Sequence, residues 1–282
     1  MSDDLGVWAY AITQDDGDHD VSFLTGVAGA PVRTARAAGL TILVSDVDLA
    51  EFGEVALRRN LVDLGWLEAV AQAHHSVIDA SSRLFPLLPT RLATVYASDE
   101  SMAAVLGAHR EELLAALRQV GGRVEMGVTA YAAPGAERED AAPAGSPAPV
   151  ADGGADRGAG MAYLRRRTAQ LSARAESWRS ALAGAQAVHA HLSRHAVLTK
   201  LHPPRTPQRS GDQREMMLNA AYLLDPDDGG GFATQVAVAA DAHPELDLDL
   251  TGPRPPYSFT ADDSEAQETE PRGPGEGPEG PA

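Results

Sequence analysis

The sequence predicts an α+β protein made of two α+β domains, each with an antiparallel-type sheet covered by helices. Three observations support this: β-prone segments alternate with amphipathic helical segments, a stretch rich in Ala, Pro and Gly interrupts them, and the final residues are acidic without apolar anchors. The predicted units are an N-terminal domain over 1–133, a flexible linker over 134–160, a C-terminal domain over 161–260 and a disordered acidic tail over 261–282.

Two β-prone segments near the N-terminus are expected to pair in the first sheet. Val7–Ile12 is a compact apolar run with two aromatic residues, and Leu40–Val44 is rich in β-branched residues and follows a glycine. Between Asp63 and Ser82, apolar residues recur at intervals of three and four. This periodicity predicts a helix that lies on the sheet.

The rest of the first domain is predicted from a second helical pattern and an alternating strand. Ser98 and Asp99 are N-cap residues for a helix that ends at the glycines 121–122. In Val124–Val128, apolar residues then alternate with less apolar ones, which is the pattern of a half-buried strand. We expect this strand to complete the first domain near Ala133.

The second domain is predicted to begin with a long amphipathic helix over Met161–Leu201. Its apolar residues follow the alternating spacing of a coiled coil, but small and polar residues at several of these positions favour packing on the chain's own sheet. Arg214–Leu224 is predicted to form a central strand, Asp225–Gly231 a turn and 232–242 a short helix. Leu246–Leu250 alternates leucine with aspartate, which predicts an exposed edge strand.

Composition limits the classes of function. The formal net charge of −17 disfavours nonspecific binding to nucleic acid or to anionic membranes, because both need clustered Lys and Arg. The chain has no cysteine, which excludes disulfides, thiol nucleophiles and Cys-ligated metals. The N-terminus lacks the pattern of a secretory signal, and no apolar run approaches the roughly 18 residues of a spanning helix. We therefore expect a cytoplasmic protein.

A search for catalytic and metal-binding patterns finds candidates that lack the necessary partners. His191 and His195 lie four residues apart on the predicted helix, as metal ligands can, but no third ligand lies nearby. The glycines 229–231 follow a strand, as phosphate-binding glycines do, but three neighbouring aspartates would repel phosphate. No nucleophile elbow, P-loop or dinucleotide-binding motif occurs. We predict no catalytic, cofactor-binding or metal-ligating residue.

Five arginines give the predicted long helix a basic stretch in an otherwise acidic chain. They are Arg165, Arg166, Arg167, Arg174 and Arg179. Such a stretch can contact an acidic partner or RNA, form a solvated helix face, or receive the chain's own acidic tail. Only one aromatic residue, Trp178, lies between two of these arginines, so a regular set of stacking residues is missing. This favours the last two interpretations over an acidic partner or RNA.

The segment Thr251–Phe259 combines three prolines, which stiffen the chain, with two aromatic residues two positions apart. We expect Tyr257 and Phe259 to anchor it as a rigid strap on the domain. A polyproline ligand for an adaptor domain is the alternative.

At these residues the chain resembles the GvpF/GvpL family of gas vesicle proteins. The second domain of that family ends in a Gly-Pro-x-Pro-Pro-Tyr-Ser-Phe segment, which is Gly252–Phe259 here, although the family commonly has Trp in place of Arg254. Further similar blocks are Val7–Tyr10, Ala73–Val77, Pro89–Tyr96, Gly121–Tyr131 and Leu218–Leu223. Within Pro89–Tyr96, the chain keeps the Pro, Arg and Thr of the family pattern at positions 89, 91 and 94.

The resemblance implies two α+β domains, no enzymatic activity and association with gas vesicles, and we expect no cofactor. The implied partner is the small hydrophobic shell protein, GvpA or a close relative, whose assembly the chain would assist; other accessory proteins are further possible partners. The signature residues, which are candidates for partner contact, are Pro89, Arg91, Thr94, Gly252, Pro253, Pro255, Pro256, Tyr257 and Phe259.

A physical hypothesis accompanies this role. An acidic chain with its own edge strand can cap a shell subunit that polymerises through β-edges. Two alternatives remain open: an oligomeric scaffold that joins other accessory proteins through the helix 161–201, and a metal-dependent enzyme that uses His191 and His195.

Overall fold

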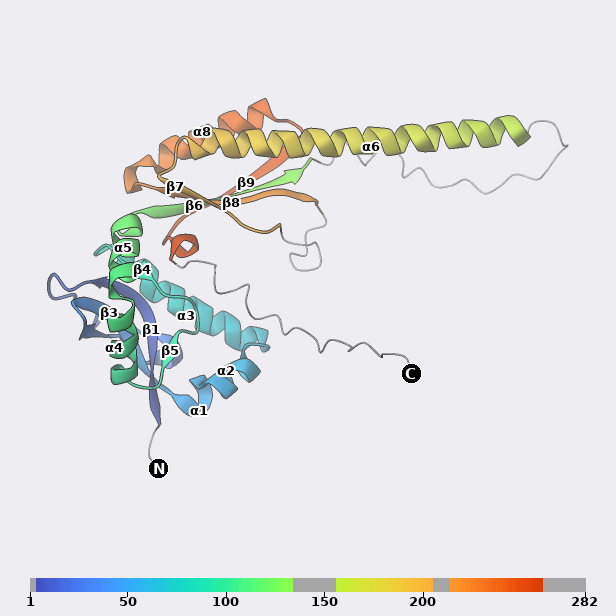
Figure 1. Ribbon diagram of the computed structural model, residues 1–282. Helices are drawn as coiled ribbons and strands as arrows, with labels where there is room; N and C mark the ends of the chain where they lie inside the picture. Colours follow the sequence, from blue (N-terminus) through green and yellow to red (C-terminus); the bar gives the residue numbers. More distant parts are fainter. Residues whose placement is uncertain (1–3, 134–155, 205–213, 261–282) are drawn as a thin grey trace, which may run out of the picture.

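The computed structural model describes residues 4–133, 156–204 and 214–260, which form two antiparallel sheets covered by helices (Figure 1). The strands of the first sheet are β1 (Leu5–Gln14), β2 (Arg33–Ala37), β3 (Leu40–Asp48), β4 (Leu88–Pro89) and β5 (Val95–Tyr96). Its helices are α1 (Leu49–Phe52), α2 (Glu54–Asn60), α3 (Leu64–Ser82), α4 (Asp99–Ala108) and α5 (Arg110–Val120). The strand order is β2-β3-β1-β4, with β5 also paired to β1. The predicted α+β class and the pairing of the first two β-prone segments are confirmed.

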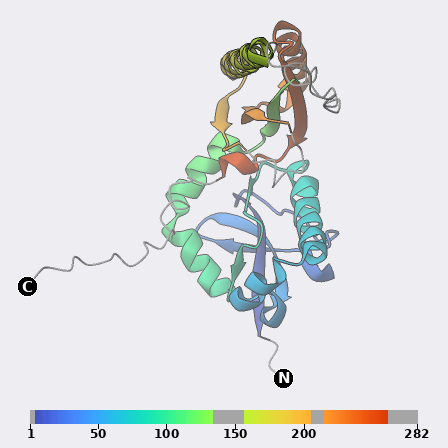
Figure 2. The same ribbon diagram turned by 90° about the vertical axis from the view of Figure 1, so that its right-hand side faces the viewer.

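β1 lies inside the first sheet, and both of its faces are covered. Every residue from Gly6 to Thr13 is buried. On one face Trp8 and Tyr10 pack with α3, and on the other Val7 and its neighbours pack with α4 and α5. Figure 2 shows these two helical layers on opposite sides of the sheet. The apolar run in the sequence therefore reflects a strand buried on both faces.

Side chains begin two of these helices at the predicted positions. Asp63 caps α3 by accepting hydrogen bonds from two backbone N–H groups, and Ser98 caps α4 through a capping box with Ser101. The prediction of one continuous helix after Ser98 is wrong, because the helix breaks at His109, where φ is −106° and ψ is 17°. The break allows α4 and α5 each to keep an apolar face on the twisted sheet.

The second sheet contains β6 (Val124–Ala132), β7 (Leu198–Leu201), β8 (Met216–Leu224) and β9 (Leu246–Arg254), in the order β7-β8-β6-β9. The predictions of a central β8 and an edge β9 are confirmed. The prediction that β6 completes the first domain is wrong, because β6 pairs with β8 and β9. Six of its nine residues are buried, so it is a central strand rather than a half-buried one. Alternation identifies which residues share a face, but it does not identify the sheet.

Two helices, α6 (Asp156–Ser193) and α8 (Gly229–Ala242), lie side by side on one face of the second sheet (Figure 1). The core residues of α6 come from its C-terminal part and are Ala181, Ala185, Val188 and Leu192. The prediction that this helix packs on its own sheet is confirmed for that part. The N-terminal part extends beyond the sheet. Within the described ranges, no helix has the length and apolar composition needed to cross a lipid bilayer.

The bounds of α6 differ from the prediction at both ends. The helix begins at Asp156, inside the predicted linker, and ends at Ser193. Leu198–Leu201 then forms β7, because this segment contains β-prone residues and finds hydrogen-bonding partners along β8. The remainder of the predicted linker, 134–155, and the predicted tail, 261–282, lie outside the described residues.

The glycines 229–231, predicted to lie in a turn, instead form the first turn of α8. A short 3-10 helix, Pro226–Asp228, precedes them. Asp227 and Asp228 therefore lie beside the positive end of the helix dipole, which offsets part of the low helix propensity of glycine.

A buried hydrogen-bond network joins α3 to β1. Trp8 Nε1 donates to Nδ1 of His74 at 3.1 Å, and Nε2 of His74 lies 3.4 Å from the carbonyl oxygen of Thr90. Because Nδ1 accepts a hydrogen bond, the proton of the neutral ring is on Nε2. The His74 side chain is buried against the ring of Tyr10, and this burial lowers the pKa of His74 to about 4.

We expect the free energy of unfolding to decrease as the pH falls from 6.5 towards about 4. In that window the unfolded chain binds a proton at His74, whereas the folded core does not. The contribution of neutral His74 is fully present above the unfolded pKa, and the whole shift corresponds to about 3 kcal/mol. His74→Gln keeps one acceptor and one donor but does not titrate, so urea denaturation at several pH values should show a smaller pH slope for this variant. Equal slopes would assign the pH dependence to other groups.

Candidate functional site at the junction of the two sheets

The first group of signature residues lies along β1. Pro89 is buried in β4 and pairs with Ala11. The backbone N–H of Ala9 donates to the carbonyl oxygen of Thr94 at 2.9 Å, and the Thr94 hydroxyl donates to the carbonyl oxygen of Arg91 at 2.8 Å. These hydrogen bonds hold Pro89, Arg91 and Thr94 in one compact loop against the central strand.

The second group, Gly252–Phe259, carries the chain from the end of β9 back to the first sheet, and we call it the junction segment. Its final residues form the short coil drawn in red between the two sheets in Figure 1. Gly252 has a φ of +107°, and a Cβ atom there would lie 2.7 Å from the carbonyl oxygen of Glu125. Only glycine fits this position. Pro255 and Pro256 are buried.

Both aromatic residues of the junction segment contact the first domain. Tyr257 packs with the apolar cluster under α3, and its hydroxyl lies 2.6 Å from Nδ1 of His75. Burial raises the pKa of Tyr257 and lowers the pKa of His75, so the hydroxyl donates to a neutral imidazole. Phe259 packs with the apolar cluster on the opposite face of the first sheet. That cluster also contains Leu223 of β8. Tyr257 and Phe259 anchor the segment as predicted, but they pack mainly on the first domain and not on the second.

The carboxylate of Glu125, at the start of β6, holds the junction segment in place. Its Oε1 accepts hydrogen bonds from Arg254 Nη2 at 2.6 Å, Arg254 Nε at 3.1 Å and Ser258 Oγ at 2.7 Å. Its Oε2 accepts from the backbone N–H of Ser258 at 2.7 Å. Glu125 is completely buried, and a buried carboxylate is tolerated only when it is paired and hydrogen-bonded in this way.

The alternating sequence pattern places Glu125 on the exposed face of a half-buried strand, but in the structure its side chain is buried. No local signal distinguishes it from a solvent-facing glutamate, because its partners come from residues more than a hundred positions later. Arg254, which replaces the common Trp of the family pattern, supplies the counter-charge here. His202 Nε2 lies 3.1 Å from Ser258 Oγ and connects the residue after β7 to the same network.

A groove of about 270 Å³ lies beside the junction segment. Pro253 and Arg254 line it together with the C-terminal end of α3, where Asp79 and Arg83 form an ion pair at 2.6 Å. Pro253 is exposed in this groove, whereas Tyr257 and Phe259 are partly covered by the first domain. A direct contact between the signature residues and a partner stays a prediction.

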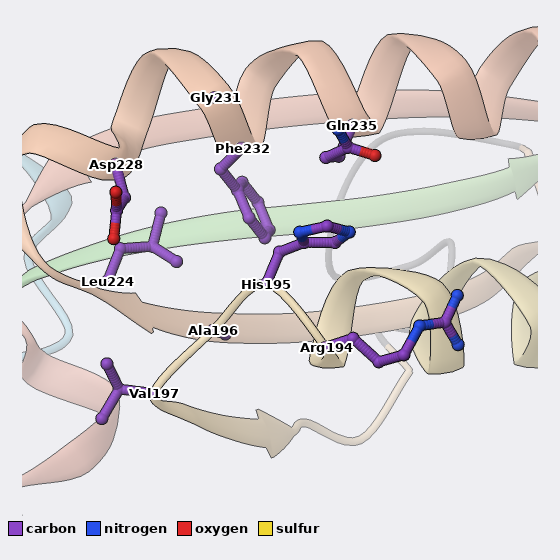
Figure 3. Close-up of a pocket in the computed structure, with 9 residues that line it drawn as sticks. All are labelled: Arg194, His195, Ala196, Val197, Leu224, Asp228, Gly231, Phe232 and Gln235. Carbon is purple, nitrogen blue, oxygen red and sulfur yellow. The ribbon is translucent and has the colours of Figure 1, made fainter.

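A second pocket, of about 390 Å³, lies between the end of α6 and the start of α8 (Figure 3). His195, Phe232 and Gln235 point into it. The neighbouring His191 donates from Nε2 to Gln235 Oε1 at 3.0 Å and accepts from Arg194 Nη2 at Nδ1 at 3.1 Å. In the described part of the chain, no three His, Cys, Asp or Glu side chains are grouped as metal ligands would be. Among the described residues, no third ligand lies with His191 and His195.

We expect Arg254→Ala to lower the free energy of unfolding by about 3 kcal/mol, because it leaves the buried Glu125 carboxylate without its counter-charge. Arg83→Ala is the matched control. It removes an exposed ion pair within one helix and should cost less than about 0.5 kcal/mol. Chemical denaturation of the two variants measures the difference, and similar small losses in both would show that the junction does not depend on this ion pair.

Two solved structures share this fold. The GvpF protein from Anabaena sp. PCC7120 matches with a TM-score of 0.61 and 20% identity, covering 92% of this chain and 97% of that one. The GvpF protein from Microcystis aeruginosa matches with a TM-score of 0.59 and 18% identity, covering 91% of this chain and 99% of that one.

Sequence comparison extends this likeness beyond the fold. Gas vesicle protein L from Streptomyces sp. (strain CB03234) is 35% identical over 266 residues, which cover 92% of this chain and 94% of the relative. The family model described as gas vesicle synthesis protein GvpL/GvpF matches residues 6–261, from the second residue of β1 to just beyond the junction segment. The chain therefore belongs to the GvpL/GvpF family of gas vesicle synthesis proteins.

Proposed function

We propose that this chain is a non-enzymatic accessory protein that works in the cytoplasm and assists gas vesicle assembly by binding the small hydrophobic shell protein. Family membership across both domains carries the accessory role.

The edge strand β9 is the surface that we propose for shell protein binding. Among the described strands, β9 pairs with β6 and with no other, so its outer backbone edge can accept a further strand. Asp247 and Asp249 lie along this strand and form ion pairs with Arg214 at 3.6 and 3.4 Å. Charges on an edge strand hinder uncontrolled pairing. We infer that Asp247 and Asp249 restrict β9 to a partner strand of complementary charge.

A second candidate function is a scaffold that joins other gas vesicle accessory proteins. The observation that favours it is the N-terminal part of α6, which extends beyond the second sheet with nearly every described side chain exposed. Both candidates are compatible with the junction segment as a structural connection, since neither requires Tyr257 or Phe259 to leave its packing site.

Co-purification with the shell protein tests the first candidate directly. A tagged full-length chain is expressed together with the shell protein, and other accessory proteins serve as controls in parallel captures. We expect selective retention of the shell protein. Retention of accessory proteins without the shell protein would contradict shell binding and support the scaffold.

We expect Asp247→Lys/Asp249→Lys to reduce shell protein retention by about tenfold, because two lysines beside Arg214 present the incoming strand with the opposite charge. The matched control is Asp15→Lys/Asp18→Lys. These two aspartates form ion pairs with one arginine, Arg36, at 3.1 and 2.8 Å, and the change in net charge is identical. Equal retention by both variants would exclude β9 as the binding edge.

A further inference from the structure

The N-terminal part of α6 carries an apolar stripe that the described part of the chain does not cover. We call residues 161–180 the α6 arm. Leu164 is 59% exposed, Leu171 54% and Trp178 43%, and none of them belongs to an apolar core cluster. Figure 1 shows the arm extending past the end of the second sheet. Large apolar side chains left exposed along one side of a helix mark an interaction surface.

The stripe has the register of a coiled-coil seam. Leu164, Leu171 and Trp178 are spaced by seven residues, and the same line continues to Ala185 and Leu192, which are buried in the core of the second domain. If Leu164 takes position d of a heptad, position a of the arm is taken by Met161, Thr168 and Ala175. Position d therefore continues from the packed part of α6 onto the arm. Position g does not, because it is buried as Ala181 and Val188 on the sheet but is arginine on the arm.

Four of the five arginines of the arm flank this seam. Arg165 and Arg179 take position e, and Arg167 and Arg174 take position g. Arg166 takes position f, on the opposite side of the helix. Residues at e and g face the flanking residues of a partner helix and decide which partner binds. A helix that complements the arm must therefore carry acidic residues at these positions.

Two other occupants fit the arm less well. In a pair formed by two copies of the arm, arginines would face arginines in either helix orientation, because e and g are both basic. The C-terminal residues 261–282 carry seven carboxylates, which match the charge of the arm. Apart from polar, charged, Gly and Pro residues, the segment 261–282 contains only alanines. It therefore has no apolar side chain large enough to cover Leu164 and Leu171.

We propose that the α6 arm docks an amphipathic helix of a partner protein, with a leucine-rich seam flanked by Glu or Asp. The inner end of the seam is fixed by Trp178, whose Nε1 donates to Glu215 Oε1 at 2.8 Å. The arm is about 30 Å long, close to three heptads, so we expect a dissociation constant on the order of micromolar. This proposal rests on the scaffold candidate and specifies the chemistry of the partner that the scaffold binds. It does not depend on shell protein binding at β9.

The test uses the full-length chain and a fluorescent synthetic peptide of about four heptads, with Leu at a and d and Glu at e and g. Fluorescence anisotropy is expected to show saturable binding that falls by about tenfold with Arg167→Glu and with Leu171→Gln. Arg166→Glu makes the same charge change one residue away, on the opposite side, and should weaken binding by less than about twofold. A peptide with Lys at e and g should not bind. Circular dichroism checks that each variant is folded.

Three outcomes would overturn the proposal. Absence of saturable binding, or equal losses with Arg166→Glu and Arg167→Glu, would show that the arm has no oriented docking face. Dimerisation of the chain alone that Leu171→Gln abolishes would assign the seam to a second copy. Binding that appears only after the carboxylates of 261–282 are replaced by amides would assign the arginines to the chain's own C-terminal residues. None of these results depends on whether the shell protein binds.

Discussion

The buried carboxylate of Glu125 is the constraint on which the connection of the two sheets depends. It lies just after the chain leaves α5 and enters β6. Its partner Arg254 is the last residue of β9, and its partner Ser258 lies four residues later. The buried carboxylate of Glu125 therefore links β6, where the chain enters the second sheet, to the end of β9, where the chain leaves it. Because the same segment continues into the packing sites of Tyr257 and Phe259, the hydrogen bonds of Glu125 also determine where these two rings meet the first domain.

This connection leaves two surfaces of the second domain directed away from the first. Tyr257 and Phe259 pack on opposite faces of the first sheet, and Leu223 of β8 shares a cluster with residues of α4 and α5. The outer edge of β9 and the α6 arm remain open to partners within the described structure. A strand edge and a helical seam recognise different partner elements, so the two proposed docking surfaces do not compete for the same kind of element.

Most elements of the fold follow from local patterns in the sequence. The caps Asp63 and Ser98 and the apolar periodicity of α3 place helices correctly, because capping and amphipathicity act within a few residues. Some wrong assignments are local, such as the helix break at His109 and the glycines that begin α8, and others concern long-range pairing. The segment before Leu201 joins a sheet instead of continuing α6, and β6 pairs in the second sheet, because a strand can lower its free energy wherever a complementary edge is available. The junction segment was recognisable from its prolines and aromatics, whereas Glu125 was not, since its burial depends on Arg254.

The sequence by itself determined the α+β class, the family, the starts of α3 and α4 and the anchoring character of Tyr257 and Phe259. These properties depend on residue types at short spacing. Tertiary structure decided which sheet receives β6, which glutamate is buried, and where α6 stops packing on its own sheet. The heptad line from Leu164 to Leu192 is continuous in sequence, yet the second sheet covers only its C-terminal part. The physical reason is that burial is a property of the assembled layers, and a helix longer than its sheet leaves the rest of its apolar line exposed.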